Sequence, residues 1–284
     1  MILVIGATGK TGSKVCEYLS NAGLAYKALT RDADKAKSVL PESAQIVQGD
    51  LSDKSHLYRV LEDVTHVYMA TPPDEHMVVY QNSVIDVARD CGVKRIVKLS
   101  GLRPSLNSEA RLPRLHAQIE EHLKESGVAY SMIRSNLFMQ VLFGDAESVK
   151  TNGKIYAPAS NGKISFTDIH NIAEVALKCL QDNSSDNHII TVTGEGAESY
   201  EQVATYLTQA TGKDVEYIPV SFEDARQSMI EAGYGHWLSD ALIELFQIYS
   251  ANDGCFVSDD FETLTGKPAS SLESFIQMNK QAFC

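Results

Sequence analysis

Hydrophobic and polar positions follow two alternating periods along the first half of the chain. Composition predicts strands at 2–5, 26–30, 45–48, 66–70, 95–99 and 130–133, and the apolar run at 2–5 suits a strand buried on both faces. Between them, apolar residues recur at helical spacing, for example over 77–91 and over 115–126, where Gly127 is typical of a helix end. Repeated strand-helix units predict an α/β fold with a doubly wound, parallel sheet of Rossmann type and right-handed crossovers.

The pattern changes after residue 134. Two short strand-like pieces lead to a helix opened by Asp168, and one more strand at 189–193 completes the sheet. Ser199 and Gln202 then form a capping-box pattern, and the rest is mostly helical with a short strand at 215–220. We therefore predict a nucleotide-binding core of residues 1–135 and 163–193, and a smaller, mostly helical substrate lobe of residues 136–162 and 194–284.

Charge and cysteine content narrow the class of ligand. The chain has 25 basic and 37 acidic residues, a formal charge of −12, which disfavours nonspecific binding to nucleic acid or to an anionic membrane. Its five cysteines are scattered, without the pairing typical of a zinc site or a disulfide framework, and no apolar run is long enough to span a membrane. We expect a cytoplasmic protein that binds a small molecule and no metal.

The first strand leads directly into the glycine motif Gly6-x-x-Gly9-x-x-Gly12. In a strand-turn-helix the first glycine permits the tight turn, the second admits phosphate oxygens to the backbone, and the third lets the helix pack on the strand. Glycines also mark plain tight turns, but the strand at 26–30 completes a βαβ unit. The motif therefore predicts a dinucleotide pyrophosphate at Gly6, Thr8, Gly9, Lys10, Thr11 and Gly12.

Arg31 ends the second strand, where NAD-binding proteins usually carry an acidic residue. A guanidinium pairs with a phosphate, so Arg31 favours NADP(H) over NAD(H), with Lys10 and Lys35 as supporting charges. Asp32 beside it complicates this interpretation, and Arg31 can also be a solvated residue at a strand end.

Several segments together resemble one family. These are the GATGKTG loop, Gly49-Asp50-Leu51, the run HAQIEEHLKESGVAYSMIRSN over 116–136, and the later PVSFE and TGKP segments. The chain resembles the NmrA-like atypical short-chain dehydrogenases, in particular the quinone oxidoreductase and triphenylmethane reductase type. The resemblance implies adenine and ribose contacts from Asp50, Leu51, Ala70, Thr71 and Pro72, and contacts beside nicotinamide from Asn136 and Phe138. Asp50 can instead cap the next helix, Pro72 can simply end a strand, and Phe138 can belong to the core.

The catalytic pair of ordinary short-chain dehydrogenases is missing. None of the 12 tyrosines is followed four residues later by lysine, which disfavours alcohol dehydrogenation and sugar epimerisation. The helix that would carry the pair presents His116, with Glu120 one turn on. We predict that His116 donates a proton or hydrogen-bonds the substrate oxygen. The alternative is a surface histidine paired with Glu120.

Ser100 ends the fifth strand at the edge of the sheet where ligands bind, so it joins His116 and Asn136 as a candidate catalytic residue. The predicted function is an NADPH-dependent reductase that transfers a hydride to a quinone or a similar flat, conjugated electrophile. Two alternatives stay open: an NADP(H)-sensing regulatory protein of the NmrA kind without turnover, and a biosynthetic reductase or isomerase with a narrow substrate. The oligomeric state, a homodimer included, is also open.

Overall fold

A seven-stranded sheet forms the centre of the first of two compact units, Met1–Arg134 with Ile169–Thr191. The structure is a computed structural model that describes residues 1–284 apart from the side chain of residue 183. The strand order is β3-β2-β1-β4-β5-β6-β8. Their bounds are β1 (Ile2–Ile5), β2 (Tyr26–Thr30), β3 (Gln45–Gln48), β4 (His66–Met69), β5 (Arg95–Gly101), β6 (Ala129–Ser135) and β8 (His188–Val192).

β1 lies between β2 and β4, and both pairs are parallel, with Ile2 opposite Tyr26 on one side and His66 on the other. β2 with β3 and β4 with β5 are parallel as well. The strand order reverses beside β1, so the doubly wound Rossmann-type sheet predicted from the sequence is confirmed. In such a sheet, ligands bind at the carboxyl ends of the strands near this reversal.

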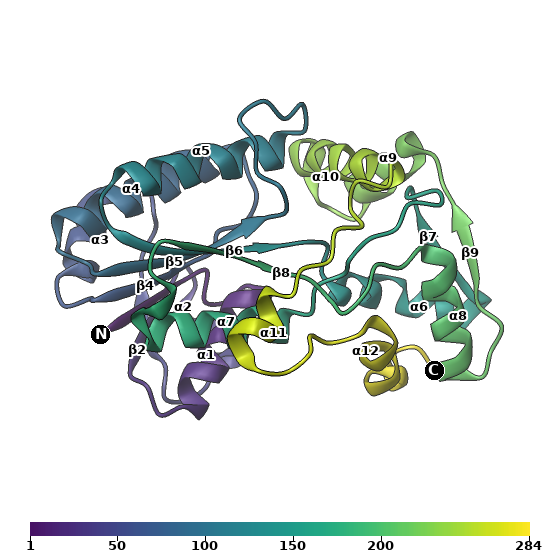
Figure 1. Ribbon diagram of the computed structural model, residues 1–284, viewed down its shortest axis with the longest axis horizontal. Coiled ribbons are helices and arrows are strands. Elements are labelled where there is room, and N and C mark those ends of the chain that lie inside the picture. Colours follow the sequence, from purple (N-terminus) through teal and green to yellow (C-terminus); the bar gives the residue numbers. More distant parts are fainter. The chain divides into compact units, whose positions relative to one another are not determined.

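Helices cover both faces of this sheet (Figure 1). α1 (Lys10–Asn21) packs against α7 (Ile169–Gln181) on one face, while α3 (Lys54–Leu61), α4 (Met77–Asp90) and α5 (Arg111–Glu125) pack side by side on the other. The short α2 (Ala33–Val39) and the 3-10 turn η2 (Asn183–Ser185) complete the unit.

α5 starts at Arg111, four positions before the predicted start. Leu112 and Pro113 extend its buried face, and proline fits a first helical turn because its missing amide hydrogen would have no partner there. Gly127 ends the segment at φ 76°, as predicted. One core cluster under α3, α4 and α5 includes Leu3, Ile96 and Ile119.

The second unit consists of Ser135–Asp168 and Val192–Cys284. Its two-stranded parallel sheet pairs β7 with β9, and the Ser199–Gln202 capping box is present at the start of α8. Residues 163–168 belong to this unit rather than to the core, because Phe166 is buried in its hydrophobic cluster and Ile164 bridges to Glu198. The mostly helical character is confirmed. The elements are η1 (Met139–Asp145), α6 (Ala146–Asn152), β7 (Lys154–Ala157), α8 (Tyr200–Thr211), β9 (Glu216–Pro219), α9 (Phe222–Glu231), α10 (Gly235–Ser250), α11 (Asp260–Thr265), α12 (Leu272–Met278) and η3 (Lys280–Ala282).

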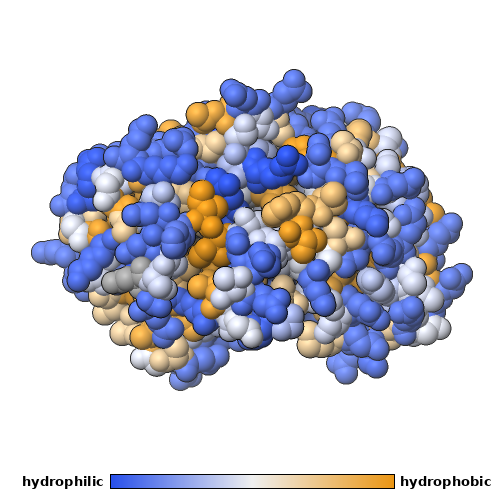
Figure 2. Space-filling model, viewed as in Figure 1, coloured by the Kyte–Doolittle hydropathy of each residue, from blue (hydrophilic) through white to orange (hydrophobic). Residues whose placement is uncertain are grey.

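Polar side chains cover most of the face seen in Figure 2, with separate hydrophobic patches between them. This agrees with a chain in which 22% of the residues are charged. Among the helices that the structure describes, none combines the length and the apolarity needed to cross a bilayer.

Candidate functional site

The glycine loop between β1 and α1 has no room for side chains. Gly6 has φ 75°, and a Cβ on it would lie 2.0 Å from the carbonyl oxygen of Ala70. A Cβ on Gly12 would lie 2.1 Å from the carbonyl oxygen of Gly6, so the helix rests directly on the turn. Gly9 donates its amide to that same oxygen at 2.9 Å, which closes the turn. Gly6 and Gly12 thus have the packing tasks that their spacing predicted.

The N-terminus of α1 lacks an internal partner for its amides. Gly9 is the N-cap and has no side chain to cap the helix, and the first turn contains no acidic residue. Thr8 is half-buried and Lys10 exposed beside this end, while Thr11 is buried. Free amides and the positive end of the helix dipole suit a phosphate group, so the loop fits the pyrophosphate of a dinucleotide.

The carboxyl end of β2 carries Arg31 and Asp32, both exposed. Asp32 is the N-cap of α2: its Oδ1 accepts from the amides of Asp34 at 3.1 Å and Lys35 at 3.0 Å. One oxygen of its carboxylate is therefore engaged by the helix, and the exposed Arg31 precedes it in the chain. Asp32 thus has a structural role at the start of α2, while the preference for NADP(H) over NAD(H) stays a prediction.

Asp50 lies next to Arg31, after β3. Its Oδ1 accepts from the amide of Ser52 at 2.8 Å and from the Ser52 hydroxyl at 2.6 Å. These bonds, with a smaller contribution from the Arg31 guanidinium, lower the pKa of Asp50. Asp53, not Asp50, caps α3, so the interpretation of Asp50 as a helix cap is wrong. Leu51 packs against the core cluster.

Ala70, Thr71 and Pro72 follow β4, the strand beside β1. The Ala70 carbonyl lies against Gly6, and Thr71 accepts a hydrogen bond from the buried Gln81 amide at 2.8 Å. Pro72 is exposed. Ala70 thus borders the glycine loop, while contact of Ala70, Thr71 and Pro72 with a cofactor stays a prediction.

β5 and α5 bring four side chains together. Lys98 and Ser100 are two residues apart and share one face of the strand, while His116 and Glu120 are one turn apart on the facing helix. Nζ of Lys98 lies 3.0 Å from Nδ1 of His116, and the Ser100 hydroxyl donates to Oε1 of Glu120 at 2.7 Å. The ring of His116 covers Gly101: a Cβ added to Gly101 would lie 3.0 Å from Cδ2 of the ring.

Glu120 also pairs with Arg134 on β6. The guanidinium donates from Nε to Oε1 at 3.1 Å and from a terminal nitrogen to Oε2 at 2.5 Å. The Glu120 side chain is 2% exposed and that of Arg134 is 23% exposed, so the carboxylate end of the ion pair is buried. The alternative in which His116 is a surface histidine paired with Glu120 is therefore wrong. His116 contacts Lys98, whereas Glu120 contacts Ser100 and Arg134.

Burial sets the electrostatics of the Lys98–His116 pair. Lys98 is 0% exposed, and desolvation lowers its pKa to about 7; the carboxylate of Glu120 opposes this effect and Arg134 adds to it. Desolvation and the neighbouring Lys98 hold the pKa of His116 well below its usual value. His116 is thus a neutral imidazole beside a lysine that can gain or lose a proton near neutral pH.

Sequence reasoning overlooked Lys98. The signal was present, since Ile96, Val97 and Leu99 surround it in a predicted strand of a parallel sheet, and such strands are usually buried on both faces, where lysine is rare. A lysine in such a strand needs a partner, and the candidates were the polar residues of the helix that packs on it. Which helix does so follows only from the fold.

Asn136 and Phe138 lie in the second unit. The Asn136 amide donates to Ser165 Oγ and to the Gly254 carbonyl, both at 2.9 Å, and its Oδ1 accepts from the amide of Leu137. Both amide hydrogens are engaged and Asn136 is 5% exposed, so it has no donor left for a ligand. Phe138 is half-buried and bridges to Thr167.

Ser100, in the first unit, is 2% exposed and donates its hydroxyl to Glu120, so its side chain supports that carboxylate.

The strand order defines an α/β protein of Rossmann type. The uncapped N-terminus of α1 after the glycine loop is typical of the phosphate-binding turn of this fold. The chain belongs to the NmrA-like family, whose model matches residues 1–274. It is 33% identical to the NAD(P)H azoreductase of Xenophilus azovorans over 100% of this chain and 99% of that one. It is 26% identical to quinone oxidoreductase 2 of Escherichia coli, with 96% of each chain covered. The triphenylmethane reductase of Citrobacter sp. has a similar fold, with a TM-score of 0.87 at 22% identity over 99% of both chains.

Proposed function

We propose that this protein is an NADPH-dependent reductase that transfers a hydride to a quinone or a similar flat, conjugated electrophile. The observation that carries the proposal is the glycine loop, where neither Gly6 nor Gly12 can bear a Cβ and the amides of α1 have no cap. The relatives named for NAD(P)H-dependent azo reduction and for quinone oxidoreduction support the reaction class.

The choice of NADPH rests on the end of β2. Asp32 is engaged as the cap of α2, so it is a poor acceptor for the hydroxyls of an adenosine ribose. Arg31 beside it is exposed and can pair with a 2′-phosphate. The carboxylate of Asp50 is close enough to interact electrostatically with this guanidinium.

The reacting end of the cofactor belongs near His116. Gly101 ends β5 and the glycine loop follows β1, so both lie at the carboxyl edge of the parallel sheet, and the His116 ring covers Gly101. β5 is two strands from β1, about 10 Å across the sheet. The bound cofactor would supply the hydride. His116, neutral and able to donate from Nε2, would give a proton or a hydrogen bond to the substrate oxygen.

Steady-state oxidation of NADPH and NADH with a panel of quinones and azo dyes tests this function. We expect turnover with NADPH, and we expect Arg31→Ala to raise KM for NADPH by about 30-fold, the equivalent of one charge-assisted contact of about 2 kcal/mol, with KM for NADH within about twofold. Equal effects on both cofactors would refute the role of Arg31. Tight binding of NADP(H) without turnover of any acceptor would favour the sensing protein instead.

A further inference from the structure

The amino group of Lys98 is buried and contacts one titratable side chain directly, the imidazole of His116. Nζ donates to the Leu99 carbonyl at 3.1 Å and contacts Nδ1 of His116 at 3.0 Å, and the residue is 0% exposed. An ammonium can only donate, so Nδ1 accepts and the ring proton resides on Nε2. His116 itself is half-buried, and its ring extends over Gly101 at the end of β5.

The charged and titratable groups around Lys98 come from two elements, α5 and β6. α5 contributes His116 and Glu120, β6 contributes Arg134, and the register partner on β4 is the apolar Met69. Glu120 is neutralised by Arg134 at 2.5 Å. Lys98 therefore has no carboxylate of its own, and its proton is held loosely.

We propose that Lys98 is a positioning residue and the proton source for His116, and that this pair equips the site for acceptors that need a proton together with the hydride. The proposal rests on the proposed function and extends it by assigning a role to Lys98 and a class of preferred substrate.

A quinone takes up one hydride and one proton to become a hydroquinone. A bound dihydronicotinamide cofactor would supply the hydride and be oxidised, and the quinone would be reduced. The Nε2–H bond of His116 breaks as the O–H bond of the product forms. An Nζ–H bond of Lys98 breaks as Nδ1–H forms, so His116 stays neutral and Lys98 becomes an amine. Water returns the proton by the reverse path once the product leaves.

A cationic triphenylmethane dye provides the contrast. Its central carbon is a carbocation, so a hydride alone converts it to the neutral leuco form and no proton is transferred. Loss of the Lys98–His116 pair should therefore slow quinone reduction and leave dye decolorisation unchanged, a split that general loss of folding or of cofactor binding would not produce.

The test compares kcat for a quinone and for a triphenylmethane dye in wild type, Lys98→Met, His116→Gln and the double variant. Methionine has nearly the length of lysine, so the packing is retained. For the quinone we expect kcat to fall about 100-fold in His116→Gln, which is the lower end of the effect of a general acid. In Lys98→Met we expect a fall of about tenfold, the equivalent of a change of about one pKa unit in the acidity of His116. The double variant should match His116→Gln, because Lys98 acts through His116. All dye rates should stay within about twofold.

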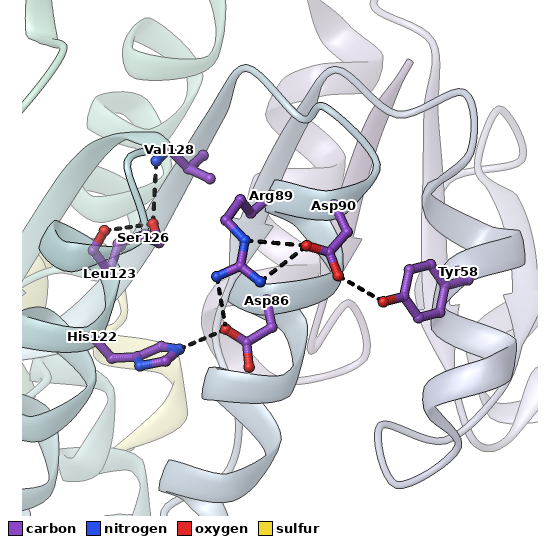
Figure 3. A network of polar contacts seen from close by, with 8 residues as sticks. All are labelled: Tyr58, Asp86, Arg89, Asp90, His122, Leu123, Ser126 and Val128. Carbon is purple, nitrogen blue, oxygen red and sulfur yellow. Dashed lines mark hydrogen bonds and ion pairs between the residues drawn. The ribbon is translucent and has the colours of Figure 1, made fainter.

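His122 gives a matched control on the same helix. It hydrogen-bonds Asp86 at 3.0 Å on the outer face of α4 and α5, in a network with Arg89, Asp90 and Tyr58 (Figure 3). His122→Gln should leave both rates unchanged. The quinone rate of wild type should fall as pH rises above about 7, when Lys98 loses its proton, and this fall should be absent in Lys98→Met.

Equal losses with quinone and dye in Lys98→Met, or an unchanged pH profile, would overturn the proposal while the proposed function stood. If wild type reduced neither acceptor, the proposed function would fail, and ¹⁵N NMR of the histidine rings would still decide the Lys98 assignment. We expect His116 to be the Nε2–H tautomer in wild type and a mixture in Lys98→Met. A wild-type ring protonated on Nδ1 would overturn it.

Discussion

Replacing Lys98 by methionine should make the protein more stable at neutral pH and below, and the gain should vanish as the pH rises. Burial lowers the pKa of Lys98 from 10.5 to about 7. At 1.36 kcal/mol per pKa unit, keeping the ammonium charged inside the fold costs about 5 kcal/mol. Methionine removes this cost but loses two hydrogen bonds, of about 1 kcal/mol each. The expected gain in free energy of unfolding is about 3 kcal/mol at pH 6.5.

The pH dependence follows from the sign of that pKa change. Between pH 7 and 10.5 the unfolded chain holds a proton on Lys98 that the folded protein has released, so the stability of wild type rises with pH in this range. The stability gained by releasing this proton is complete above pH 10.5, the pKa of the unfolded chain, and is lost as the pH falls through about 7, the pKa in the folded protein. The advantage of Lys98→Met should therefore shrink by about 1.4 kcal/mol per pH unit above 7 and be close to zero at pH 9.

Urea denaturation followed by circular dichroism at pH 6.5, 8 and 9 measures this difference, with His122→Gln as the control. Other titrating groups are common to both proteins and cancel in the comparison. A Lys98→Met protein that is less stable than wild type by an amount independent of pH would refute the reasoning, because it would mean that Lys98 is an ordinary, solvated ammonium.

Three further changes have distinct expected results. Gly12→Ala places a Cβ 2.1 Å from the Gly6 carbonyl oxygen, so the loop must open and calorimetric binding of NADPH should weaken at least about 100-fold, or about 3 kcal/mol. Asn136→Ala leaves buried partners unpaired and should lower the unfolding free energy by about 2 kcal/mol while kcat stays unchanged; a selective loss of kcat would restore its predicted catalytic role. Glu120→Gln removes the carboxylate that holds Arg134 and opposes the pKa fall of Lys98, so stability should drop by about 2 kcal/mol and the quinone pH profile should move to lower pH; an unmoved profile would contradict this coupling.

Local patterns predicted the elements well. The apolar runs gave the seven strands of the sheet within about two residues, and Gly127 marked the end of α5. The start of α5 was placed four residues late because Leu112 and Pro113 extend a helix that the pattern from 115 onward already defined. Residues 163–168 were assigned to the core, since their strand-like composition does not indicate which hydrophobic cluster takes up Phe166.

The sequence by itself determined the glycine loop, the parallel sheet and the absence of a Tyr/Lys pair, because these depend on residue type and on spacing within a few turns of one element. Only the tertiary structure decided which side chains meet. His116 and Glu120 lie one turn apart on α5, yet the first contacts Lys98 and the second contacts Ser100 and Arg134. Strand β5 places residues 98 and 100 against that face of α5, and the burial of Lys98 between the strand and the helix lowers its pKa to about 7. Partner choice and desolvation arise where elements distant in sequence pack together, so no pattern along the chain contains them.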